Sequence, residues 1–150
     1  MGIESIKNII LNKVKLIKDS IGNMFSEDEV IYIVENKQWS IKEDGEILKK
    51  YASKKIRLST SPFMVRNKVV HYGSINCFYT GKNFKVAHKS NKIIVNWFHI
   101  SHENIKSTLI KKMNKCVDIW YTSCSHTSNK LIKIGIDRNK IRVIPIPYDF

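Results

Sequence analysis

Short apolar runs rich in β-branched residues recur along the chain. They lie at residues 29–34, 55–60, 68–74, 91–101, 116–124 and 140–146. Most are apolar almost throughout, which is typical of strands buried on both faces, whereas a strand with one wet face alternates apolar and polar residues. The runs therefore predict the strands of a parallel sheet.

Segments with helical periodicity separate these runs. We expect helices from Asp44 to about residue 54, from 103 to 114 and from 126 to 134, with Ser125 as a cap and Gly135 as the end of the last one. Residues 73–84 are expected to be irregular or to form a short helix. Strands that alternate with helices predict an α/β fold. The expectation is a Rossmann-like three-layer domain with a mostly parallel sheet and helices on both faces.

Residues 1–24 predict a separate amphipathic helix, ahead of a domain at 28–150. Its apolar positions follow three- and four-residue steps: Ile3, Ile6, Ile10, Val14, Ile17 and Ile21. Its lysines, Lys7, Lys13, Lys15 and Lys18, mostly fall elsewhere on the helix. Two interpretations stay open. The helix lies on an anionic lipid surface, or its apolar side docks on its own domain or on another one.

Charge and length narrow the class of protein. The 150 residues suffice for one domain with a real core, and the net charge of +13 favours polyanionic partners. The longest strictly apolar run, 30–34, is far shorter than the roughly 20 residues that span a bilayer. The expected location is cytoplasmic, with peripheral attachment to the inner face of the cell membrane through the basic helix.

Familiar cofactor and metal motifs are absent from the sequence. The three cysteines, Cys77, Cys116 and Cys124, form no CxxC pair, so we expect neither a metal site nor a disulfide scaffold. No GxGxxG or GxxxxGK[ST] motif is present, which disfavours dinucleotide and P-loop sites. No bound cofactor is expected.

Polar residues gather where the predicted strands end. Ligands of parallel sheets bind at these carboxyl ends, and small, hydroxyl and imidazole groups suit a polyhydroxylated ligand. The candidate binding residues are Trp39, Ser40, Asp44, Gly45, His71, Gly73, Ser74, His99, Ser101, Ser123 and His126. Structural alternatives stay open: the histidines as satisfied structural groups, Ser40 as a helix cap, and Trp39 as a core residue rather than a sugar-stacking one.

The last third of the chain resembles a known enzyme family. VDIWYTSCSHTSNKLIKIGIDRNKIRVIPIPYD, at 117–149, resembles a segment of glycosyltransferases with the two-Rossmann-domain (GT-B) architecture, particularly family 4. The residues that match in order are Ser123, Ser125, Asn129, Leu131, Gly135, Ile136, Lys140, Ile141, Pro145 and Asp149. NKIIVNWFHIS, at 91–101, has His99 in the family's histidine position, and WSIKEDGEIL and VVHYGSINCF look like regions of capsule or lipopolysaccharide sugar transferases. The resemblance covers about residues 28–150.

Two departures accompany the resemblance. ENKQWSIKEDG, at 35–45, replaces the family's usual Gly-Gly turn, which puts donor-phosphate contact there in doubt. Pro147 stands where the family usually has glycine. The family's second domain, which carries most of the nucleotide-sugar site, is absent from these 150 residues.

The resemblance implies the amino-terminal, acceptor-binding half of a glycosyltransferase. Its partners would be a nucleotide-sugar donor, a glycan or lipid-linked acceptor, and the missing carboxyl-terminal domain or a partner subunit, with no specific nucleic acid. His99 would be the catalytic residue near the transferred sugar, and the other strand-end residues would line the acceptor pocket. Alone, the chain should be nearly inactive, because transfer needs both substrates held together. The alternative is a stand-alone basic Rossmann-like module that binds nucleic acid or a partner subunit without catalysis.

Overall fold

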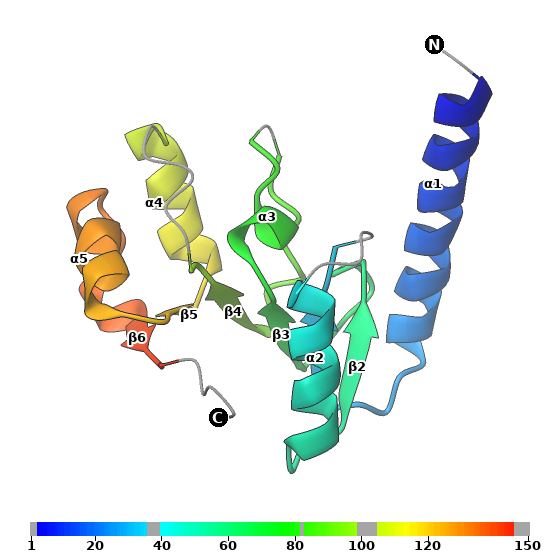
Figure 1. The fold of residues 1–150 in the computed structure, drawn as a ribbon, viewed down its shortest axis with the longest axis horizontal. Coiled ribbons are helices and arrows are strands. Elements are labelled where there is room, and N and C mark those ends of the chain that lie inside the picture. The colour runs from blue at the N-terminus through cyan, green and yellow to red at the C-terminus, as the bar shows by residue number, and fades with distance from the viewer. Residues whose placement is uncertain (1–2, 36–39, 82, 99–104, 146–150) are drawn as a thin grey trace.

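A computed structural model describes residues 3–35, 40–81, 83–98 and 105–145. Within them, six strands form one sheet, and every neighbouring pair is parallel, in the order β2-β1-β3-β4-β5-β6. The elements, in chain order, are α1 (Ile3–Met24), β1 (Val30–Ile33), α2 (Ser40–Tyr51), β2 (Ile56–Ser59), β3 (Val69–Tyr72), α3 (Ile75–Phe78), β4 (Lys92–Asn96), α4 (Ser107–Cys116), β5 (Ile119–Thr122), α5 (Ser125–Lys133), a 3₁₀ turn (Arg138–Lys140) and β6 (Ile141–Val143). The predicted α/β class is confirmed (Figure 1).

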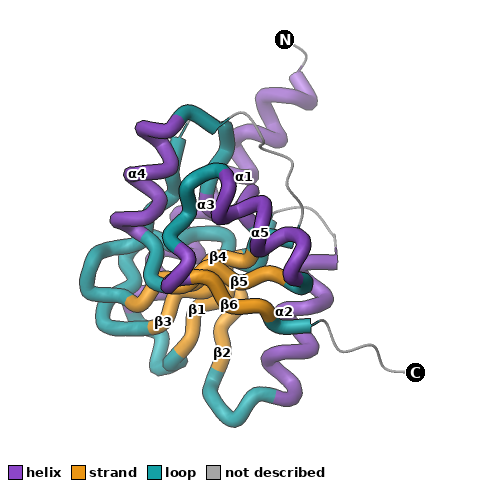
Figure 2. Tube along the Cα trace, turned by 90° about the vertical axis from the view of Figure 1, so that its left-hand side faces the viewer, coloured by secondary structure: helices purple, strands orange, loops and turns teal. Residues whose placement is uncertain are grey.

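Helices cover both faces of the sheet, as expected for a three-layer Rossmann-like fold. Figure 2 shows α3, α4 and α5 on one face and α2 on the other. The first face holds the main core, in which Trp97 and Trp120 are fully buried with their ring centroids 5.5 Å apart. The second face holds a smaller cluster around Tyr32, Val34 and Ile56. This division follows from the pleat, since alternate residues of each strand point to opposite faces.

Helix α2 begins at Ser40, so the expected start at Asp44 is wrong. Gly45 lies inside the helix and is buried against the sheet. A Cβ atom added at Gly45 would lie 2.8 Å from Leu58 Cδ2 and 2.9 Å from Tyr32 Cδ1. The close approach that glycine permits therefore accounts for a residue that would otherwise weaken a helix.

Other predicted boundaries also shift, including those of β5, which spans Ile119–Thr122, and the end of α4, which lies at Cys116. Strands β4 and β6 end earlier than their apolar runs, at Asn96 and Val143. Helix α5 begins at Ser125, and Cys124 takes the cap position that we assigned to Ser125. Gly135 ends α5 as expected and has a φ of +100°, a conformation that glycine adopts readily.

Polar contacts hold the last turns of α1 against the segment that follows β2. Asp19 accepts hydrogen bonds from the Thr60 amide (2.8 Å) and hydroxyl (2.5 Å). The Ser20 and Ser61 hydroxyls are 2.6 Å apart, and the Asn23 amide donates to the Ser61 carbonyl at 2.7 Å. The apolar side of α1 takes no part in this attachment and is exposed. Among the described residues, the interpretation that this side docks on its own domain is therefore wrong.

Candidate functional site

The sheet changes direction between β1 and β3. From β1 the chain crosses to β2 on one side, and from β3 onward each new strand adds on the other side. The connections therefore leave this point on opposite faces, through α2 after β1 and α3 after β3 (Figure 2). In open α/β sheets such a switch point opens a crevice at the carboxyl ends of the strands, where ligands bind. The fold thus places the best candidate site beside Tyr32 of β1 and His71 of β3, which are register partners.

An imidazole ring stands between two tyrosine rings at this point. The His71 ring centroid lies 4.8 Å from that of Tyr32 and 5.8 Å from that of Tyr121, both with edge-on geometry. The Phe98 ring follows, 5.4 Å from Tyr121. These side chains lie on the face that α2 covers, because they alternate with the residues of the main core. The result is a row of rings along the switch point.

Seven buried side-chain atoms lack a hydrogen-bond partner among the described residues, and two of them lie in this row. They are Nε2 of His71 and Oδ1 of Asn96. Asn96 as a whole is only 2 % exposed. Asn96 is the register partner of Tyr121, so it lies beside the rings. Buried polar atoms are almost always paired, and an orphaned one calls for an explanation. Two hydroxyl groups of a ligand, one at each atom, would satisfy them.

The charge of Asp44, on α2, acts on two tyrosines of this row. Burial raises the pKa of Tyr32 and of Tyr121, and the charge of Asp44 raises both further. Partial burial, followed by the charge of Glu43, raises the pKa of the Asp44 carboxyl itself. The Asp44 side chain is exposed on α2, and its negative charge disfavours ionisation of both phenols. We call Tyr32, Asp44, His71, Asn96 and Tyr121 the switch-point cluster.

Burial also fixes the charge state of His71. Loss of hydration lowers its pKa to about 4, so the imidazole is neutral at neutral pH. A neutral imidazole offers one donor and one acceptor nitrogen. His71 can therefore hydrogen-bond a hydroxyl group in either direction, but it is a poor proton acceptor for catalysis near pH 7.

The structure brings together only some of the predicted site residues. Asp44 and His71 belong to the cluster. Gly45 and Gly73 border it but are buried by packing. Ser74 caps α3 by accepting a hydrogen bond from the Cys77 amide at 3.3 Å.

The other predicted residues are less informative about a site. Ser40 is exposed at the start of α2, Ser123 is half-buried after β5, and His126 is exposed in the first turn of α5. Trp39, His99 and Ser101 lie outside the described residues. The expected catalytic role of His99 therefore stays a prediction.

Sequence reasoning missed Tyr32, Asn96 and Tyr121. All three lie inside apolar runs rather than at their ends, so a search of strand ends passes over them. The available signal was a phenolic or amide side chain within the otherwise mostly apolar strands VIYI, KIIVN and IWYT. A polar atom inside a doubly covered strand must find a partner, which makes such positions worth testing.

A hollow of about 510 Å³ lies at the opposite, amino-terminal edge of the sheet, between β1 and the segments before β3 and β4. It is lined in part by Glu29, Lys54, Lys68 and Lys92. Lys54 pairs with Glu29 at 2.6 Å, and Lys68 donates to the carbonyls of Ser26 (2.6 Å) and Asp28 (2.5 Å). Two of its three lysines are thus engaged in structural contacts. The hollow is a weaker candidate than the switch point.

The described residues contain no group of three or more His, Cys, Asp or Glu side chains that could hold a metal ion. No family model, curated protein or solved structure matches the chain. The site itself is therefore the basis on which a function can be inferred.

Replacing Asn96 tests whether its buried oxygen is an uncompensated group. We expect Asn96→Leu to raise the free energy of unfolding by about 1 kcal/mol, because it removes a buried acceptor without a partner. Urea denaturation measures this change. The control is Asn91→Leu, since the Asn91 amide donates to the carbonyls of Val65 (3.0 Å) and His88 (2.9 Å). That variant should lose about 2 kcal/mol. A comparable loss in Asn96→Leu would show that Asn96 is already satisfied in the free protein.

Proposed function

We propose that this chain is the acceptor-binding domain of a glycosyltransferase, which moves a sugar from a nucleotide-sugar to a hydroxyl group of a glycan or lipid-linked acceptor. The observation that supports it most is the switch-point cluster, where His71 Nε2 and Asn96 Oδ1 are buried and unpartnered among the described residues, beside aromatic rings. A Rossmann-like fold agrees with the proposal but serves many unrelated functions, so it adds little by itself.

Sugar chemistry fits these groups. A pyranose ring presents C–H groups, which pack on aromatic rings, and hydroxyl groups that both donate and accept hydrogen bonds. Tyr121 and Phe98 would contact the C–H groups. One hydroxyl would pair with the neutral imidazole of His71 and another would donate to Oδ1 of Asn96. The exposed Asp44 carboxylate would accept a third hydrogen bond.

The cluster is proposed to position the acceptor, and transfer needs further groups. His71 binds and orients, because a pKa of about 4 leaves it a weak base at neutral pH. We also propose His99 as the catalytic residue, which is the role that the family resemblance implies for it. A donor-binding domain or subunit would supply the nucleotide-sugar. We therefore expect residues 1–150 to bind sugar weakly and to turn over very little on their own.

Ligand-detected NMR with short oligosaccharides and nucleoside diphosphate sugars tests this proposal. We expect His71→Phe to weaken oligosaccharide binding by about tenfold, because it keeps a ring in place and removes the nitrogen that bonds the sugar. The control is His88→Phe, since the His88 side chain is exposed and its Nδ1 lies 3.0 Å from the Ser90 hydroxyl. Circular dichroism confirms that both variants fold.

Two outcomes would contradict the proposal. One is binding of every sugar unchanged by His71→Phe, which would place the sugar elsewhere. The other is no sugar binding at all, together with binding to any nucleic acid that falls steeply with added salt. That second pattern would favour the basic binding module, which the net charge of +13 also permits.

A further inference from the structure

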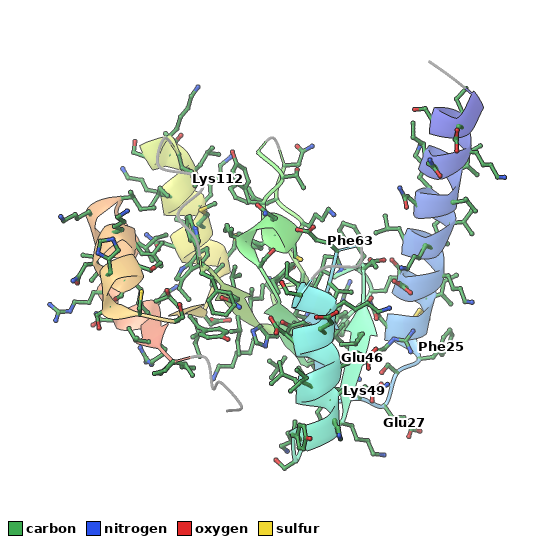
Figure 3. All side chains as sticks on the ribbon, in the orientation of Figure 1. Phe25, Glu27, Glu46, Lys49, Phe63 and Lys112 are labelled. Carbon is green, nitrogen blue, oxygen red and sulfur yellow. The ribbon has the colours of Figure 1, made fainter. Side chains whose placement is uncertain are left out.

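Helix α1 carries an apolar stripe that the described residues leave uncovered. Its members are Ile6, Ile10, Val14, Ile17 and Ile21, and each is between 44 and 59 % exposed. The stripe is about 23 Å long at 1.5 Å per residue. Figures 1 and 3 show the upper turns of α1 standing clear of the sheet, with side chains that project away from the domain. Five exposed aliphatic side chains in one row are unusual for a helix of a globular protein.

The side of α1 that attaches to the domain is a different one. Asp19, Ser20 and Asn23 make its hydrogen bonds to the segment after β2. At 100° per residue, Asp19 and Asn23 lie about 180° and about 140° around the helix from the centre of the stripe, and Ser20 lies about 80° from it. The polar contacts therefore fix the helix with its apolar stripe facing outward.

Lysines flank the stripe on both sides. Lys7 and Lys18 lie on one side and Lys13 on the other, each within about 80° of its centre. The two acidic residues of α1 lie farther away, and one of them, Asp19, is engaged with Thr60. The stripe and its flanks thus present apolar groups between positive charges.

We propose that α1 binds the surface of an anionic lipid bilayer, with its stripe among the acyl chains and its lysines at the headgroups. Such helices lie in the interface plane and combine apolar burial with attraction to anionic lipid. No helix in the described part of the chain is long and apolar enough to cross a membrane. A second copy of the chain fits the stripe less well, because pairing two stripes would bring lysines together without acidic partners.

The attachment of α1 to the domain also determines which edge of the sheet would lie near the bilayer. The last turns of α1 contact residues 60–63, which follow the carboxyl end of β2. The switch-point cluster lies at the carboxyl ends of β1, β3 and β5, which belong to the same edge of the sheet. A membrane-bound α1 would hold that edge near the lipid surface. The membrane proposal stands independently of the sugar proposal, since it rests on α1 alone.

Co-sedimentation of residues 1–150 with vesicles tests the stripe. The probes are phosphatidylcholine vesicles with and without about one-third phosphatidylserine. We expect binding to the anionic vesicles, and at least about a tenfold loss for Ile10→Asn, because a buried isoleucine contributes strongly to partitioning. The matched control is Leu11→Asn, since Leu11 is 55 % exposed against 56 % for Ile10 but lies off the stripe. It should lose less than about threefold.

Two double variants that each remove two positive charges test whether the lysines of α1 contribute to binding. Lys7→Gln with Lys18→Gln should weaken anionic binding by about twentyfold, at about fivefold for each lysine near the surface. Lys111→Gln with Lys112→Gln changes the net charge equally on α4, away from α1, and should have little effect (Figure 3). Equal losses in the two double variants would overturn the proposal in favour of diffuse attraction.

Two further results would also overturn it. Absence of binding to anionic vesicles is one. The other is a concentration-dependent dimer in analytical ultracentrifugation that Ile10→Asn abolishes, which would assign the stripe to a second copy. Because Ile10 is exposed, its replacement should leave the fold intact, and circular dichroism checks this.

Discussion

Lowering the pH from 7 to 4 is expected to remove about 3 kcal/mol of stability through His71 alone. Its pKa is about 4 in the folded protein, where burial disfavours the charged form, against about 6.5 in an unfolded chain. As the pH falls through 6.5, the unfolded chain takes up a proton that the folded protein does not. The free energy of unfolding therefore falls between pH 6.5 and pH 4, by about 1.4 kcal/mol for each unit of pKa difference.

The His71→Phe variant isolates this contribution. Other groups, including Asp44, also take up protons as the pH falls, but they are common to the wild type and the variant. Urea denaturation at several pH values should show a stability difference that is constant above pH 7 and shifts in favour of the variant as the pH falls. His88→Phe should follow the wild type. Parallel pH profiles for the wild type and His71→Phe would mean that the folded protein protonates His71 freely, and the cluster would then be open to water.

The sequence pattern was sufficient to predict the layers of this fold. Apolar runs predicted all six strands, and helical periodicity before the first run and between later runs predicted α1, α4 and α5. Strand ends were harder, because apolar residues can fill the core after a strand has ended. Trp97 shows this: it follows the last residue of β4 and is still fully buried beside Trp120. Hydrophobicity reports burial, and burial alone does not define where a strand stops.

The site was predictable only in part, for a physical reason. The rule that ligands bind at strand ends led to His71 and Asp44, but the strand order that makes β1 and β3 the switch point depends on tertiary structure. Ser74 was assigned to a ligand, yet its hydroxyl caps α3. Small and hydroxyl residues serve caps and close packing as readily as ligands, and sequence alone does not separate these uses.

The side to which α1 attaches was not predictable either. Its periodicity defined an apolar stripe correctly, and core-facing helices share that pattern. The contacts that hold α1 come instead from Asp19, Ser20 and Asn23, which meet partners about 40 residues away in the chain. Short polar side chains give no periodic signal of docking, so only the tertiary structure shows that the stripe faces outward.

The Gly73→Val variant is expected to have the second large effect on stability. It distinguishes a packing role of Gly73 from a ligand-binding role. A Cβ atom at this position would lie 2.5 Å from Ile41 Cγ2 and 2.7 Å from the Tyr32 hydroxyl oxygen. Neither neighbour can move freely, since Tyr32 is 2 % exposed and Ile41 packs against its cluster. We expect Gly73→Val to lower the free energy of unfolding by about 3 kcal/mol, at the upper end of overpacking costs.

The effect of Gly73→Val should extend to the site, because displacing Tyr32 moves the ring that packs against His71 at 4.8 Å. Thermal denaturation measures the stability change, and Gly81→Ala is the comparison. At Gly81 nothing lies within 4 Å of an added Cβ, so only its φ of +81° opposes alanine, at about 1 kcal/mol. If Gly73→Val were as mild as Gly81→Ala, the space in front of Gly73 would be free. A ligand could then approach the backbone there, and Gly73 would regain the binding role that the sequence predicted.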